Sequence, residues 1–88
     1  MTSYHGVVST LRVLGTSWCG DCARSTAFLR EHEVDFEWID IESDEDAARE
    51  VELLNHGHRV VPTIIFDDGT VLREPSNADL AATLSIEL

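Results

Sequence analysis

The chain has 88 residues, of which 43% are hydrophobic and 26% charged, and this is enough for one globular domain but not for two. The chain has seventeen acidic residues and six basic ones, all arginine. Its net charge of −11 argues against binding to nucleic acid or to an anionic membrane surface. We therefore expect one domain over residues 1–88, with a lead-in over residues 1–9, that acts as a monomer.

The first half of the chain predicts a strand, a helix and a second strand. Leu11–Gly15 is typical of a strand, because its apolar residues occupy both faces. A helix is expected over Gly20–His32. Its apolar stripe should contain Ala23, Ala27 and either Phe28 or Leu29. Alternation over Asp35–Ile41 then predicts a strand that is covered on much of both faces.

A second helix and a third strand follow. The spacing Ser43-x-x-Asp46 resembles a capping box and predicts the start of a helix that ends near Gly57. Its inner stripe should comprise Ala47, Val51 and Leu54. Val60-Val61-Pro62 leads into the third strand, Thr63–Phe66, because a residue before proline is extended and proline is tolerated where a strand begins.

The last part predicts a hairpin and a final helix. Asp67-Asp68-Gly69 is a strong turn pattern, so Thr70–Arg73 should return antiparallel to the third strand. Ser76-x-x-Asp79 predicts a cap for the last helix. The inner face of that helix should contain Leu80, Ala81 and Leu84.

This order, β-α-β-α-β-β-α, predicts an α/β fold. The first two strands are joined through a helix and should be parallel, with a right-handed crossover. The last two should form a hairpin, which completes one four-stranded mixed sheet flanked by helices.

The candidate reactive segment is Trp18-Cys19-Gly20-Asp21-Cys22, which joins the first predicted strand to the first predicted helix. A thiolate attacks disulfides, and the positive end of a helix stabilises an anion at its start. Cys19 therefore has the position of a nucleophile and Cys22, one turn later, that of a resolving thiol. Gly20 should let the backbone turn tightly and leave the approach open.

Two other interpretations of the cysteines stay open. Cys19 and Cys22 could bind zinc together with His56 and His58, although His-x-His is not the usual spacing of a second ligand pair. They could also be inert core residues, but the flanking Trp18 indicates a turn. Trp18 itself either packs in the fold or contacts substrate.

Several ordered motifs over Leu11–Leu84 resemble the glutaredoxins: Trp-Cys-x-x-Cys, Ile-Asp-Ile in the second strand, Val-Pro-Thr before the third, and Asp-Gly-Thr in the turn. Val60–Thr63, Asp67–Thr70 and Pro75-Ser76 look most like the mycoredoxin branch. The resemblance implies a thioredoxin-type fold and a cis Val61–Pro62 bond beside Cys19. It also implies that the Val61 backbone pairs with the bound thiol.

The same resemblance implies sites for the carboxylates of a thiol co-substrate at Arg59 and at Ser76-Asn77. This sequence departs from glutathione-using members at Thr16, where they carry lysine, and at Glu74-Pro75, where they carry two glycines. These departures favour mycothiol over glutathione. Asp21 replaces the usual aromatic residue, and a carboxylate there disfavours the thiolate anion.

We therefore expect a cytoplasmic enzyme, because two cysteines spaced C-x-x-C suit a reducing compartment and no export signal precedes them. It should reduce mixed disulfides of proteins with a low-molecular-weight thiol as co-substrate, no bound cofactor, and a reductase system that restores the thiol pool. Two alternatives remain. One is a thioredoxin-reductase-coupled electron donor, for example to ribonucleotide reductase. The other is a module that binds zinc or an iron–sulfur cluster.

Overall fold

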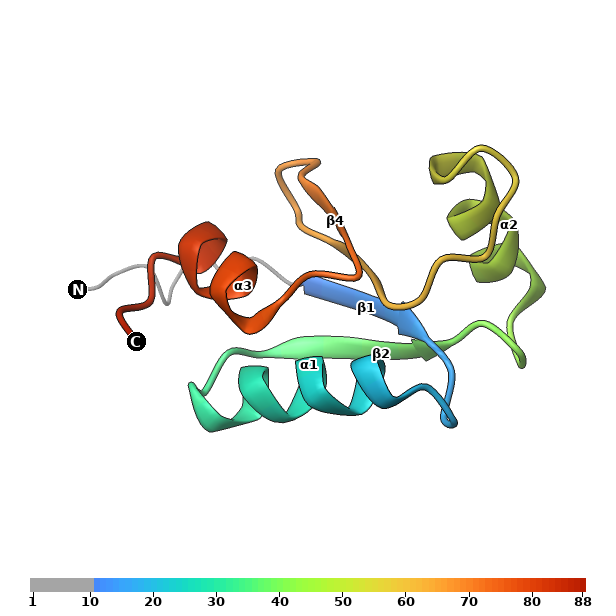
Figure 1. Cartoon of the computed structure of the whole chain (residues 1–88). Helices are drawn as coiled ribbons and strands as arrows, with labels where there is room; N and C mark the ends of the chain where they lie inside the picture. The colour runs from blue at the N-terminus through green and yellow to red at the C-terminus, as the bar shows by residue number, and fades with distance from the viewer. Residues whose placement is uncertain (1–10) are drawn as a thin grey trace.

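The computed structural model describes residues 11–88, so the predicted lead-in lies outside the described residues. The elements in chain order are β1 (Leu11–Gly15), α1 (Gly20–Glu31), β2 (Phe36–Asp40), α2 (Glu45–Leu54), β3 (Thr63–Ile65), β4 (Val71–Arg73) and α3 (Asn77–Leu84). Figure 1 shows this arrangement. The predicted order is confirmed, and β2, β3 and β4 are each slightly shorter than predicted.

The four strands form one mixed sheet in the order β2-β1-β3-β4. β1 pairs with β2 in parallel, with Val13 opposite Trp38, whereas β3 is antiparallel to both β1 and β4. Gly69 closes the β3–β4 turn with a φ of 94°, a conformation that glycine adopts without strain. The predicted sheet and hairpin are both confirmed.

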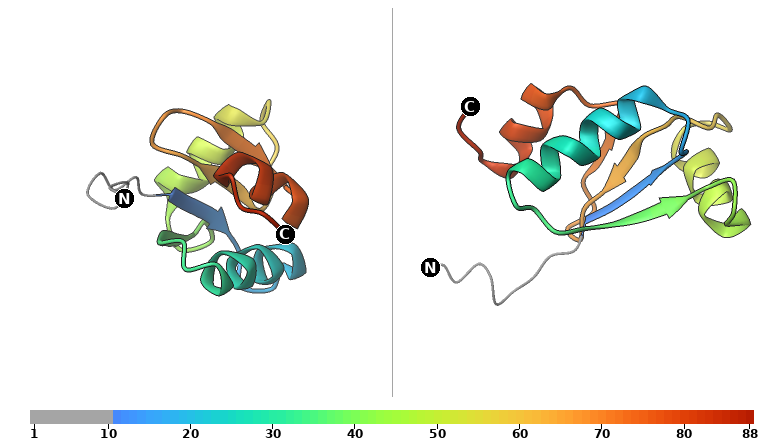
Figure 2. Two further views of the ribbon diagram at one scale, coloured as in Figure 1. Left: turned by 90° about the vertical axis from the view of Figure 1, so that its left-hand side faces the viewer. Right: turned by 90° about the horizontal axis from the view of Figure 1, so that it is seen from below.

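Helices cover both faces of this sheet (Figure 2), and the alternation in β1 decides which side chain meets which helix. Leu11 and Val13 face α1 and α3, in a cluster with Phe28, Leu29, Ile64, Leu80 and Ala81. Leu14 points the other way and packs with Ile41, Ala47, Ala48 and Val51 under α2. Full burial of such side chains contributes roughly 1.5–3 kcal/mol each, so these two clusters hold the layers together.

The predicted stripe of α1 is partly wrong. The buried residues are Cys22, Ser25, Thr26, Phe28 and Leu29, whereas Ala23 and Ala27 are exposed. Thr26 is tolerated inside because its Oγ1 donates to the Cys22 carbonyl oxygen at 3.0 Å. The helix is therefore rotated so that Cys22 and the two polar residues, rather than the alanines, face the sheet.

Two further predictions are wrong in detail. β2 is an edge strand, and Glu37 and Trp38 on it are exposed, so it is not covered on both faces. The N-cap of α2 is Asp44 instead of Ser43, because the Asp44 carboxylate accepts the Ala47 N–H at 3.0 Å. The predicted Ser76–Asp79 capping box of α3 is confirmed, with both of its hydrogen bonds present.

Candidate active site

Cys19 lies in the loop between β1 and α1, and it is the N-cap of α1. Its backbone is extended, and its Sγ accepts the N–H of Cys22 at 3.2 Å. A sulfur in this position receives a donor that the helix leaves unpaired, together with the positive end of the helix dipole. Cys19 is partly exposed, so a substrate sulfur has access to it.

Cys22, one turn further on, is only 1% exposed. Burial, and after it the hydrogen bond with Cys19, raise the pKa of the Cys22 thiol to about 12. A thiol with that pKa is neutral near pH 7, and a neutral thiol is a poor nucleophile. The two cysteines are both free thiols, yet their surroundings differ sharply.

Gly15 lies directly against the Cys22 sulfur and close to the Trp38 indole. A Cβ atom at Gly15 would collide with the Cys22 Sγ and would lie 3.0 Å from the Trp38 indole. Only a residue without a side chain therefore fits at the end of β1. Sequence reasoning missed both residues, although a glycine that ends a buried strand directly before the cysteine loop indicates a close approach.

The Val61–Pro62 peptide bond is cis, as the resemblance predicts, and it lies beside Cys19. The Cys19 thiol donates to the Val61 carbonyl oxygen at 3.8 Å. The loop that carries this bond is held through buried Asn55, whose Nδ2 donates to Thr63 Oγ1 at 3.3 Å, and the Thr63 Oγ1 in turn donates to Val60 O at 2.7 Å. Backbone polar groups of Val61 are thus presented next to the nucleophilic position.

Residues in the loop around Cys19 have contrasting environments. Trp18 is 70% exposed, so its interpretation as a packing residue is wrong, and its Nε1 donates to Glu42 Oε2 at 3.0 Å. Thr16 is buried, and its Oγ1 has no hydrogen-bond partner among residues 11–88. Gly20 is the first residue of α1, its φ is not positive, and a Cβ there would meet open space. The turn therefore does not require glycine, but the approach to Cys19 is open.

The start of α3 is tied to α1 by an arginine that sequence reasoning missed. Arg24 donates to Asn77 Oδ1 at 2.7 Å and to Pro75 O at 2.9 Å, and it lies 3.6 Å from the Asp21 carboxylate. Ser76 is occupied in the capping box with Asp79. The structure therefore brings Asp21, Ser76 and Asn77 to one side of the cysteine pair, with their polar groups already engaged.

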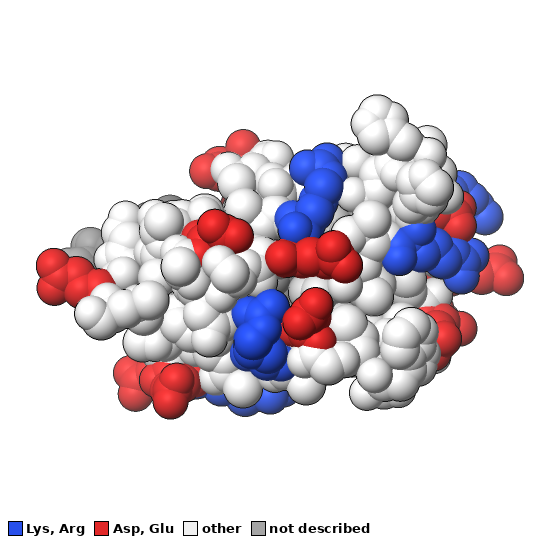
Figure 3. Space-filling model, viewed as in Figure 1, with Lys and Arg blue, Asp and Glu red and all other residues white. Residues whose placement is uncertain are grey.

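Arg59 lies in the loop between α2 and β3, two residues before Val61. Its Nε donates to Glu52 Oε2 at 2.7 Å. On the face shown in Figure 3, acidic side chains lie beside the arginines, and the described residues form no continuous basic patch there. Positive charge close to the site is therefore largely neutralised by the chain itself.

The described part of the chain holds no group of three or more His, Cys, Asp and Glu side chains that could bind a metal ion. The predicted alternative of zinc bound by Cys19, Cys22, His56 and His58 is therefore not supported by residues 11–88. In the same residues, no helix has the length and apolar character needed to cross a bilayer.

Comparisons with known proteins agree with this geometry. The sequence pattern of the family described as Glutaredoxin matches residues 7–71. A Mycobacterium tuberculosis protein named as a glutaredoxin is 37% identical over 78 residues, which cover 89% of this chain and 93% of the relative. Mycoredoxin 1 of Corynebacterium glutamicum is 34% identical over 77 residues, covering 88% of this chain and 95% of the relative.

Solved structures show the same fold. A mutant of a thioredoxin-like protein superposes with a TM-score of 0.73 at 27% identity, covering 88% of this chain and 96% of the other. A glutaredoxin from Archaeoglobus fulgidus also gives 0.73, at 22% identity, over 96% of this chain and 95% of the other. The predicted thioredoxin-type fold is confirmed.

Proposed function

The chain belongs to the glutaredoxin family of disulfide oxidoreductases, and from this we propose that it reduces mixed disulfides between proteins and mycothiol, with Cys19 as the nucleophile. The observation that carries the proposal is the contrast between the two sulfurs. Cys19 is accessible at the start of α1, whereas Cys22 is buried and its pKa is raised to about 12.

The reaction begins when the Cys19 thiolate attacks the sulfur of the small thiol in a protein mixed disulfide. A bond forms between Cys19 and that sulfur, the old S–S bond breaks, and the protein leaves as a thiolate that takes up a proton. The Val61 carbonyl oxygen accepts from the Cys19 thiol, so the Val61 backbone lies beside the new bond, and this supports pairing with an amide group of the bound thiol.

A second molecule of the small thiol then attacks the mixed disulfide on Cys19. The products are the symmetrical small-molecule disulfide and the Cys19 thiolate, and a reductase later returns two electrons to that disulfide. Cys22 resolves only those intermediates that a second small thiol does not reach, because a thiol with a pKa of about 12 attacks slowly near pH 7.

Two observations support mycothiol rather than glutathione as the co-substrate. The relative from Corynebacterium glutamicum is named a mycoredoxin. The cationic groups on both sides of the site are engaged, Arg24 by Asn77 and Pro75 and Arg59 by Glu52. Glutathione carries two carboxylates and mycothiol none, so a site without free cations suits mycothiol. With a reduced thiol pool as its electron source, we propose that the enzyme acts in the cytoplasm.

A turnover assay with a mycothiol mixed disulfide tests the proposal. We expect Cys19→Ser to abolish turnover and Cys22→Ser to retain at least half of it, since a second thiol resolves the intermediate. Loss of turnover in Cys22→Ser would establish the dithiol route instead. Supplying mycothiol, glutathione or thioredoxin with its reductase as the only electron source identifies the physiological reductant, and turnover with thioredoxin alone would overturn the proposal.

A further inference from the structure

An arginine on α1 connects the segment between the two cysteines to the start of α3. Arg24 Nη2 lies 3.6 Å from the carboxylate of Asp21, one helical turn before it. The same Nη2 donates to the Pro75 carbonyl oxygen at 2.9 Å, and Nη1 donates to Asn77 Oδ1 at 2.7 Å. Two hydrogen bonds to the segment that begins α3 therefore hold this guanidinium beside Asp21.

The Asp21 carboxylate lies between Cys19 and Cys22 in the chain, and its charge acts on the buried sulfur. Burial is the largest cause of the raised pKa of the Cys22 thiol, the hydrogen bond with Cys19 follows, and the negative charge of Asp21 acts in the same direction. A cation 3.6 Å from Asp21 offsets part of that negative charge. Arg24 therefore favours the thiolate form of Cys22.

The thiolate fraction of Cys22 limits how fast this residue can resolve a mixed disulfide, because only the thiolate attacks. When the pKa of a thiol lies far above the ambient pH, each unit of pKa changes the thiolate fraction about tenfold. The intrinsic nucleophilicity changes only about threefold, in the opposite direction. The thiolate fraction therefore decides the rate, and a cation that favours the Cys22 thiolate speeds the attack.

We propose that Arg24 sets the rate at which Cys22 resolves the mixed disulfide on Cys19, by neutralising Asp21 from a position that the start of α3 fixes. The inference rests on the proposed function, since it takes Cys19 as the nucleophile and Cys22 as a resolving thiol. In this step the Cys22 thiolate attacks Cys19 Sγ, and a disulfide forms between the two cysteines. The bond from Cys19 to the small thiol breaks, and the small thiol leaves as a thiolate that takes up a proton. Arg24 acts through Asp21 and is therefore a positioning residue.

The test uses one equivalent of dithiodipyridine, an uncharged disulfide whose encounter with the protein does not depend on these charges. Attack by Cys19 releases one thiopyridone and leaves the other on Cys19, and attack by Cys22 then releases the second. Stopped-flow absorbance separates the two releases. We expect Arg24→Gln to slow the second release about threefold, equivalent to ~0.7 kcal/mol, which is typical of a partly exposed ion pair. Arg24→Lys keeps the charge and should restore most of the rate.

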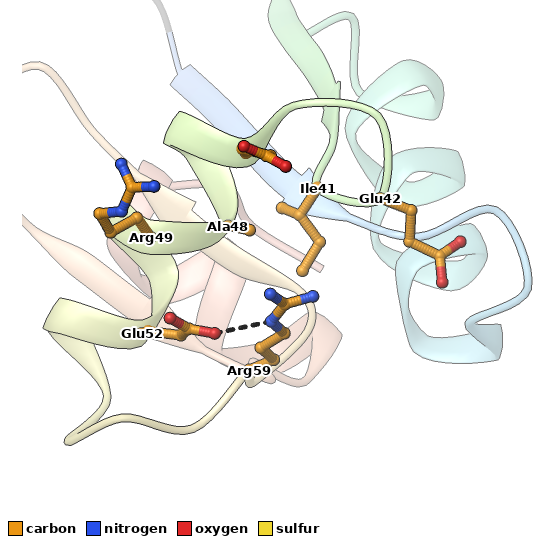
Figure 4. A pocket seen from close by; sticks show the side chains of 7 residues that line it. Ile41, Glu42, Ala48, Arg49, Glu52 and Arg59 are labelled. Carbon is orange, nitrogen blue, oxygen red and sulfur yellow. Dashed lines mark hydrogen bonds and ion pairs between the residues drawn. The ribbon is translucent and has the colours of Figure 1, made fainter.

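A matched control is available on α2. Arg49, labelled in Figure 4, lies 3.5 Å from Asp46, three residues before it, as Arg24 lies near Asp21. Arg49→Gln should leave the rate of the second release unchanged. In an Asp21→Asn background the slowing caused by Arg24→Gln should disappear, because no carboxylate remains to be neutralised. A first release of full amplitude shows that each variant is folded and that its Cys19 reacts.

The inference is overturned if Arg24→Gln matches Arg49→Gln, if Arg24→Lys is as slow as Arg24→Gln, or if the slowing persists beside Asp21→Asn. It is also overturned if the wild-type protein releases only one thiopyridone, because Cys22 then does not resolve the intermediate. Dithiodipyridine replaces the natural small thiol, so these outcomes do not depend on which co-substrate the protein uses. Absence of turnover with a mycothiol mixed disulfide would instead refute the proposed function, so the two failures are distinguishable.

Discussion

Replacing Gly15 by alanine adds one atom, the Cβ, to the packing behind the active site. The added Cβ would collide with the Cys22 Sγ and would lie 3.0 and 3.2 Å from two atoms of the Trp38 indole. Gly15 is in a strand between two layers, so the backbone has little room to shift. Overpacking of this kind costs typically ~1–3 kcal/mol. In a domain of this size, each kcal/mol lowers the melting temperature by about 4–8 °C.

A double-mutant cycle isolates the sulfur contact. In a Cys22→Ala background the closest obstacle is absent, and only the indole contact remains. We therefore expect the cost of Gly15→Ala to fall by ~1 kcal/mol or more in that background, a coupling typical of residues in direct contact. Urea denaturation of the four proteins measures it. Costs that add within about 0.5 kcal/mol would refute the assignment of Gly15 as the residue that makes room for the sulfur.

Two predictions concern buried groups of α1. The Cys22 pKa is raised to about 12 in the folded protein, so between pH 9 and 12 the unfolded chain binds fewer protons, and stability should fall by up to ~1.4 kcal/mol per pH unit. Denaturation at several alkaline pH values should show this slope, and Cys22→Ser should lack it; an equal slope in both proteins would contradict the assignment. The Ser25 hydroxyl is fully buried without a hydrogen-bond partner among residues 11–88, so Ser25→Ala should raise stability by about 1 kcal/mol. A lower melting temperature for Ser25→Ala would show that the hydroxyl is paired.

The sequence predicts the fold well where local rules and packing agree. In β1, alternation sends Leu11 and Leu14 to opposite faces, and the structure gives each face its own helices. The prediction fails in α1, because Ala23 and Ala27 fit a helical stripe as well as Ser25 and Thr26 do. The rotation of that helix is decided by the need to bury Cys22 and by the capping of its start at Cys19, which a count of apolar residues does not include.

The sequence predicts the two reactive cysteines of the site but not the residues that contact them. Spacing alone places Cys19 and Cys22 one turn apart, and the resemblance adds the cis bond at Val61. Trp38 on β2 lies beside Gly15, and a contact between segments so distant in the chain leaves no local pattern. Glu52 is only seven residues from Arg59, but the turn of the chain that pairs them is seen only in the folded structure. Whether the guanidinium groups of Arg24 and Arg59 have hydrogen-bond partners likewise depends on the folded structure.

The sheet ends in two strands, β2 and β4, that have no outer partner among residues 11–88. Such edges can recruit strands of other molecules and begin aggregation. β4 has only three residues, and β2 carries Glu37 and Asp40, so neither offers a long apolar template. With a net charge of −11, copies of the chain also repel one another. Lowering the pH toward the isoelectric point of about 4.4 removes that repulsion, so near this pH only the shortness of β4 and the side chains of β2 keep the two edges from pairing with other molecules.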